Sequence, residues 1–295
     1  MSGDYDGKNK EGVIMKKTIS ILGVLAACAL GLLSPEAGFS QERPFYLKDR
    51  GPGIPTSMFG TYIQKGEWIV YPFFEYYLDN NMEYSPNEFG FSLDQDFRGR
   101  YRASEGLMFL GYGLTDRIAL EVEVAAIRAS LEKSPDDLSG MPDKLTESGV
   151  GDMQIQLDWM WSKETERRPG FFSYAEIVFP HHKTKYLIGT PELETKVGIG
   201  MIRGFRWGTI TVRAAVEQAG GVFDVGEFAV EYYKRLSKSF CVYAGFEGTQ
   251  DEIEFISEIQ WWLSDTVRFM INNAFGVTSK ATDWAPEIGL MISFK

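Results

Sequence analysis

From Glu67 to the end of the chain, the sequence is a series of segments, about ten residues each, in which apolar and polar side chains alternate. In residues 208–217, for example, one face carries Ile210, Val212, Ala214 and Val216, and the other carries Thr209, Thr211, Arg213, Ala215 and Glu217. A period of two is typical of strands with one apolar face, because successive side chains of a strand point to opposite sides. This repeated alternation limits the chain to folds built almost entirely from strands.

The pattern predicts about twelve strands, joined by connections that alternate in length. The strands cover 67–78, 99–113, 117–129, 149–161, 170–180, 194–203, 208–218, 226–235, 239–248, 252–262, 266–276 and 284–294. On one side the connections are mostly longer: 79–98, 130–148, 181–193, 219–225, 249–251 and 277–283. On the other side they are mostly short: 114–116, 162–169, 204–207, 236–238 and 263–265.

One-sided short turns are typical of bacterial outer-membrane barrels, which have an even number of strands, short periplasmic turns and longer extracellular loops. We therefore predict an all-β fold over residues 67–295, a transmembrane antiparallel up-and-down β-barrel. A soluble β-sandwich is the structural alternative, although its strands are usually five or six residues long.

The start of the chain predicts export. Residues 1–40 read as an upstream extension followed by a cleaved signal peptide: Lys16 and Lys17 precede the apolar run Ile19–Leu33, and small residues lead to a cleavage site near Ser40. Residues Leu25–Cys28 also resemble a lipoprotein cleavage site, so acylation of Cys28 is the alternative. Together with the barrel, this segment predicts a protein of the bacterial outer membrane.

Residues 41–66 lack any strand-like alternation. They are irregular and rich in Gly and Pro, as in Gly51–Pro55, which makes a strand there improbable. We expect a periplasmic segment or a plug. After cleavage near Ser40 only Cys241 remains, so we expect no intrachain disulfide, no metal site built on cysteine pairs and no cofactor.

The polar faces of the strands are candidates for the lining of a lumen. Charges facing lipid cost about 2–4 kcal/mol for Arg or Lys at mid-membrane, so the polar faces are assigned inward. The candidates are Glu105, Glu121, Glu123, Asp152, Asp158, Glu176, Lys196, Arg213, Glu217, Glu227, Glu231, Glu254, Glu258, Arg268 and Glu287. Carboxylates predominate, which favours a passage for cations or neutral polar solutes. A closed interior of mutually satisfied charges stays open as the alternative.

The net charge and the final strand indicate which partners to expect. The net charge of −11 disfavours binding to nucleic acid. The expected partners are outer-membrane lipid, a small-molecule solute and the barrel-assembly machinery, since the final strand ends in Met291–Phe294 and resembles the assembly signal.

The sequence carries no recognisable catalytic motif. His181 and His182 are adjacent and have no recognisably spaced further ligands, which favours an exposed loop start over a metal site. Outer-membrane phospholipases share a His-x-Ser-Asn arrangement. The corresponding stretch here, His181–Thr184, reads His-His-Lys-Thr and lacks the Ser-Asn pair. We therefore expect no enzyme, and an outer-membrane lipid-modifying enzyme is the most distant alternative.

Three short stretches carry a resemblance to a known family: Gly66–Phe73, Tyr112–Arg117 and Gly149–Asp152. With them the chain resembles the outer-membrane transporters grouped under the MetA pathway of phenol degradation. The resemblance implies a barrel, from about Glu67 to the end, that passes organic molecules, hydrophobic ones included. A channel for small solutes is thus the first expectation, and a non-conducting structural or binding barrel is the second.

Overall fold

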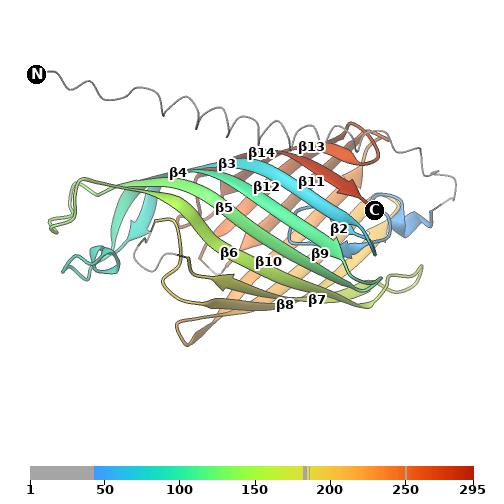
Figure 1. Cartoon of the computed structure of the whole chain (residues 1–295), viewed down its shortest axis with the longest axis horizontal. Coiled ribbons are helices and arrows are strands. Elements are labelled where there is room, and N and C mark those ends of the chain that lie inside the picture. The colour runs from blue at the N-terminus through green and yellow to red at the C-terminus, as the bar shows by residue number, and fades with distance from the viewer. Residues whose placement is uncertain (1–42, 182–184, 186, 250) are drawn as a thin grey trace, which may run out of the picture. The chain divides into compact units, whose positions relative to one another are not determined.

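The computed structural model describes residues 43–181, 185, 187–249 and 251–295. The signal peptide, Cys28 and His182 lie outside these residues. The described chain is a closed antiparallel barrel of twelve strands, each paired with its neighbours in sequence order, with β14 closing on β3 (Figure 1). The all-β barrel prediction is confirmed, and closure excludes the sandwich, whose two sheets have free edges.

The barrel strands are longest on one side of the sheet. They are β3 (Trp68–Tyr84), β4 (Phe97–Gly113), β5 (Ile118–Glu132), β6 (Lys144–Ser162), β7 (Gly170–Phe179), β8 (Glu194–Phe205), β9 (Gly208–Ala219), β10 (Val222–Arg235), β11 (Phe240–Gly248), β12 (Ile253–Trp262), β13 (Val267–Gly276) and β14 (Trp284–Phe294). Two 3₁₀ turns, η2 (Phe45–Leu47) and η3 (Pro86–Phe89), are also present. No helix in the described part of the chain is long and apolar enough to span a membrane.

Three connections differ clearly from their predicted lengths. The segment 130–148 is shorter than expected, because β5 continues to Glu132 and β6 begins at Lys144. The segment 219–225 was expected among the longer connections, yet β9 and β10 are joined by Gly220 and Gly221 alone. Both have positive φ, 57° and 82°, a backbone conformation that glycine adopts without steric cost. The segment 79–98 is shorter than expected, because β3 continues to Tyr84 through a register shift between Asp79 and Met82.

The N-terminal segment contains a hairpin, which corrects the expectation that it is too irregular for strands. Strands β1 (Ile54–Pro55) and β2 (Tyr62–Ile63) pair antiparallel. Each has only two residues, which is too few for an alternation to be visible in the sequence. Ile54 and Ile63 are fully buried among side chains from the inner face of the barrel, including Tyr71, Phe109 and Met291.

Candidate functional site

All the predicted lumen residues lie on the inner face of the barrel. Their positions alternate with exposed apolar residues such as Val212 and Val216 on β9 or Ile259 and Trp261 on β12. The inward residues are Glu105, Glu121, Glu123, Asp152, Asp158, Glu176, Lys196, Arg213, Glu217, Glu231, Glu254, Glu258 and Arg268, with Glu227 and Glu287.

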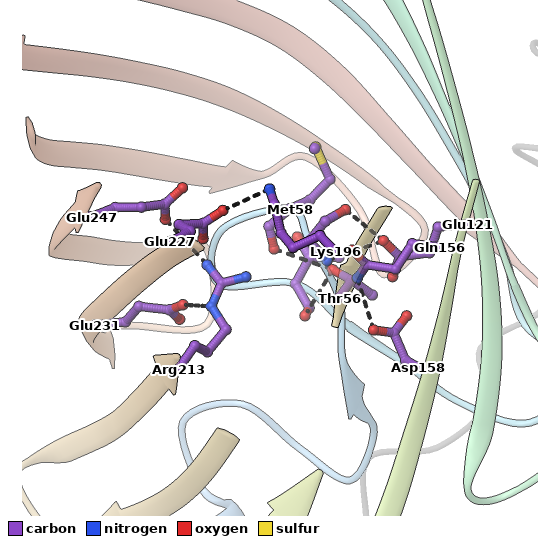
Figure 2. Close-up of polar contacts among 12 residues, drawn as sticks. Thr56, Met58, Glu121, Gln156, Asp158, Lys196, Arg213, Glu227, Glu231 and Glu247 are labelled. Carbon is purple, nitrogen blue, oxygen red and sulfur yellow. Dashed lines mark hydrogen bonds and ion pairs between the residues drawn. The ribbon is translucent and has the colours of Figure 1, made fainter. Parts of the chain in front are cut away.

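Arg213 is the centre of one charged group. Its Nε lies 2.6 Å from Glu231 Oε1, and its Nη2 lies 3.2 Å from Glu247 Oε2 (Figure 2). The Arg213 side chain is only 8% exposed, and the two carboxylates balance its charge. A buried cation held by two acids is electrostatically satisfied, so this wall of the interior carries little uncompensated positive charge.

Lys196 forms a second group on the same wall. Its Nζ lies 3.2 Å from Glu227 Oε2 and 3.5 Å from Glu176 Oε1. Lys196 also pairs across strands with Glu217 on β9 and with Glu176 on β7. The groups around Lys196 and Arg213 therefore contain more carboxylates than bases.

The opposite wall carries a row of carboxyl groups in direct cross-strand register. Asn272 pairs with Glu258 on one side and Glu287 on the other, Glu287 pairs with Glu75, and Glu75 pairs with Glu105. Among the described residues, no Lys or Arg lies within ion-pairing distance of these four glutamates. Like charges directly opposite one another destabilise a sheet. We call these four glutamates, together with Asn272, the carboxylate row.

Glu121 and Asp158 form a third group, at the tip of the hairpin. Both are buried, with exposed fractions of 2% and 1%. The backbone N–H and hydroxyl of Ser57 donate to Glu121 Oε2, at 3.1 and 2.5 Å. Gln156 Nε2 donates to Asp158 Oδ1 at 2.8 Å. Figure 2 shows Thr56 and Met58, which flank Ser57, together with Glu121, Gln156 and Asp158. The N-terminal hairpin thus binds directly to predicted lumen residues.

Further contacts seat the hairpin against the opposite strands. The ring of Phe59 packs on Tyr243 with centroids 5.1 Å apart, and the carbonyl of Phe59 accepts from Gln260 Nε2 at 3.4 Å. Near the short turns, Arg50 Nη2 lies 2.8 Å from Glu164 Oε2, with both side chains buried. Segment 43–66 therefore fills the part of the interior next to the short turns.

Two of the predicted residues are engaged elsewhere. Asp152 accepts hydrogen bonds from the backbone N–H of His181 and of Thr190, at 2.7 and 2.5 Å, so it anchors the connection between β7 and β8. Arg268 lies with its guanidinium 4.7 Å from the ring centroid of Trp262. Both side chains point inward, but each has a local structural partner.

The sequence analysis missed several inward carboxyl groups, among them Glu75, Glu194 and Glu247. Glu247 continues the inward stripe of Cys241, Tyr243 and Gly245, so the alternation on β11 could have identified it. Glu75 lies in an aromatic-rich stretch with rings on both faces, which hid the alternation.

Two cavities lie at the two ends of the barrel. One, of about 310 Å³, opens near the long connections and is lined by Tyr77, Asp79, Met82, Glu83, Tyr101, Glu105, Glu252, Lys280 and Thr282. The other, of about 390 Å³, lies beside the N-terminal segment and is lined by Arg50, Ile63, Gln64, Lys65, Lys163 and Glu164 among others. The first cavity is predominantly acidic and borders the carboxylate row through Glu105.

The titratable groups outside the barrel strands with shifted pKa values include Lys280 and Tyr62. A hydrogen bond to Asp251 and the nearby charge of Glu83 raise the pKa of Lys280, which lies as a cation between Glu83 on β3 and Asp251 in the connection between β11 and β12. Burial raises the pKa of Tyr62 above its usual value, so the hairpin contributes a neutral phenol to the interior. No group of three or more His, Cys, Asp or Glu side chains in the described residues is arranged to hold a metal ion.

Comparison with known proteins supports the fold alone. No model of a known protein family matches the sequence, and no curated protein matches it either. Among solved structures, the COG4313 outer membrane channel from Pseudomonas putida F1 is similar, with a TM-score of 0.61, 11% identity, and coverage of 81% of this chain and 99% of that chain. The KdgM porin is similar with a TM-score of 0.50, 8% identity, and coverage of 77% and 99%. The chain therefore has the fold of outer-membrane channel barrels.

Proposed function

We propose that this protein is an outer-membrane channel that passes small solutes through a lumen rich in carboxylates, and that it has no enzymatic activity. The observation that carries the proposal is the carboxylate row, whose glutamates have no cationic partner in the described chain. A closed structural interior would pair its charges, as Arg213 does with Glu231 and Glu247. Carboxyl groups without a cationic partner, one of which, Glu105, lines a cavity, instead suit a water-filled path.

Segment 43–66 acts in this proposal as a plug that narrows the path near the short turns. Its support is the set of contacts from Ser57 and Phe59 to the inner face. The same contacts favour the second candidate, a non-conducting structural or binding barrel, because they fill part of the interior. The MetA-pathway resemblance adds small organic molecules as the proposed solute class.

Single-channel conductance in planar bilayers distinguishes the conducting channel from the non-conducting barrel. The refolded barrel is compared with a variant lacking residues 43–66 and with Ser57→Ala, which removes only the hydroxyl donor to Glu121. We expect conductance to rise strongly in the deletion variant and modestly in Ser57→Ala. A folded barrel that conducts in neither the full-length nor the deletion form would establish the non-conducting alternative.

A further inference from the structure

The barrel end with the short turns carries an arc of exposed basic side chains. Five turns lie at this end, and four of them, from the β4–β5 turn to the β10–β11 turn, contribute to the arc. Its members are Arg117, Lys163, Arg167, Arg168, Arg206 and Lys238, which we call the basic arc. In the described chain, none of the six forms an ion pair with a carboxylate.

The acids near the basic arc do not neutralise it. Glu164 is buried and already bound to Arg50 and Arg203, at 2.8 and 3.4 Å. The exposed acids in these turns are Asp116 and Glu166, with Asp265 in the one turn that lacks a basic residue. The arc is therefore a surface of net positive charge over four adjacent turns.

Exposed aromatic residues adjoin the basic arc on the outer face of the barrel. Trp207, 56% exposed, directly follows Arg206 and stacks between Phe205 and Tyr232, with centroids 4.9 and 5.9 Å away. Arg117 Nη1 donates to the carbonyl of Trp161 at 3.0 Å. Trp and Tyr rings prefer the headgroup level of a membrane. Basic groups beside such rings are placed to reach the lipid phosphates.

The opposite end of the barrel, with the longer connections, carries more exposed acids than exposed bases in the described chain. Among the residues that the structure describes, its exposed acids are Glu88, Asp94, Asp96, Asp136, Asp143, Glu192, Asp224, Asp251, Glu252 and Asp283, against the exposed bases Arg100, Arg102, Arg128 and Lys144. Among the described residues, exposed acids outnumber exposed bases at this end, whereas exposed bases outnumber exposed acids at the short-turn end. Charge complementarity matches that end, and not the other, to an anionic lipid surface.

We propose that the basic arc binds the phosphate headgroups of anionic phospholipids in the leaflet next to the short turns. Arginine is suited to this partner, because its planar guanidinium donates two parallel hydrogen bonds to phosphate oxygens. The binding selects the lipids around one part of the barrel and fixes the depth of that end in the membrane. The inference rests on the membrane placement in the proposed function.

Tryptophan quenching by brominated lipids tests the proposal. Five of the exposed tryptophans, Trp68, Trp159, Trp161, Trp207 and Trp261, lie at the short-turn end, so the fluorescence reports mainly on that leaflet. The protein is refolded into vesicles that mix phosphatidylglycerol with brominated phosphatidylcholine, and the relative affinity for the anionic lipid is measured. We expect a preference of roughly three- to tenfold at low salt that falls towards one at about 0.5 M salt, because surface charges are screened.

Two matched variants separate the arc from general charge effects. Combined Arg167→Gln, Arg168→Gln, Arg206→Gln and Lys238→Gln should reduce the preference to about one. Combined Arg100→Gln, Arg102→Gln, Arg128→Gln and Lys144→Gln removes the same charge from the other end and should leave it unchanged. A preference that persists in the first variant, or that is absent from the unmodified protein, overturns the proposal.

Two further results keep the interpretation clear. Inorganic phosphate should lower the preference no more than chloride of equal ionic strength, and a larger loss would assign the arc to small anions and overturn the lipid assignment. If the first variant does not fold, the salt dependence of the unmodified protein decides alone. Failure of the unmodified protein to insert into vesicles would contradict the proposed function, whereas insertion without lipid preference contradicts only this inference.

Discussion

At the scale of single residues, two glycines show that the N-terminal segment lies in close contact with the barrel. A methyl group on Gly204 would lie 1.9 Å from the carbonyl oxygen of Tyr46, and one on Gly113 would lie 2.0 Å from that of Gln64. Both neighbours are backbone atoms, which cannot rotate away as a side chain can. The inner face is therefore shaped to accept the backbone of segment 43–66 at these points.

Gly204→Ala should displace the segment near Tyr46 without unfolding the barrel. We expect trypsin to cleave faster at Lys48 and Arg50 in the folded protein, because the segment then spends more time away from the inner face. Limited proteolysis followed by mass spectrometry measures this rate. Gly106→Ala is the control, since no atom lies within 4 Å of the added methyl group. Equal cleavage rates in Gly204→Ala and the unmodified protein would show that the contact is unimportant.

At the scale of elements, the strands present two faces with different requirements. On β9, Val212 is 37% exposed on the outer face, whereas its neighbour Arg213 is buried on the inner face with two acidic partners. The outer neighbours of Val212 across the sheet are Met201 and Val230. This outer surface is apolar, as a surface in contact with lipid must be.

Val212→Arg tests that the outer face contacts lipid. Arg at mid-membrane on the lipid face costs about 2–4 kcal/mol of folding free energy in transmembrane barrels. We expect this loss in urea titrations of the protein folded into lipid vesicles, followed by gel mobility. Leu138→Arg is the control, because Leu138 is 91% exposed in the connection between β5 and β6. Similar stability for the two variants would show that Val212 does not face lipid.

The bounds of a strand were predictable where the alternation continues to its ends, and they were not predictable where the alternation stops earlier. β9 was expected at 208–218 and spans Gly208–Ala219, and β13 was expected at 266–276 and spans Val267–Gly276. β3 was expected to end at 78, but it continues through Asp79, Asn80 and Asn81, where both faces are polar. Pairing with β4 extends this strand, and pairing between strands leaves no local pattern in the sequence.

The same distinction holds for the interior. The local sequence indicates which residues point inward, but it does not indicate contacts between segments that are distant in the sequence. The inward position of Glu121 follows from the alternation along β5, because strand geometry fixes it. The hydrogen bonds from Ser57 to Glu121 join residues 64 apart in the sequence, and nothing in the irregular segment 41–66 indicated them. The inward positions of these residues could thus be predicted, but their contact with the hairpin could not.

At the scale of the whole molecule, the charges of the interior are unevenly distributed. Bases and acids are paired on the wall formed by β7 to β11, and the carboxylate row crosses β12, β13, β14, β3 and β4. The field of unpaired carboxylates raises the local concentration of cations when low-dielectric walls surround them. The proposed channel should therefore prefer cations to anions.

Combined Glu75→Gln, Glu105→Gln and Glu287→Gln should reduce this preference while the barrel stays folded. Removing like charges from adjacent strands relieves repulsion, so stability should be unchanged or higher. Reversal potentials in a potassium chloride gradient measure the selectivity, in the full-length protein and in the variant lacking residues 43–66. Combined Glu88→Gln, Asp94→Asn and Asp224→Asn is the control, because it removes three exposed acids outside the lumen.

The dependence on salt separates a field effect from simple size exclusion. The Debye length falls from about 10 Å at 0.1 M to about 3 Å at 1 M, so selectivity that arises from the carboxylate row should weaken over this range. Selectivity by pore width would not change. Anion preference in the unmodified channel, or cation preference that is equal in the row variant and the control, would contradict the role of the carboxylate row.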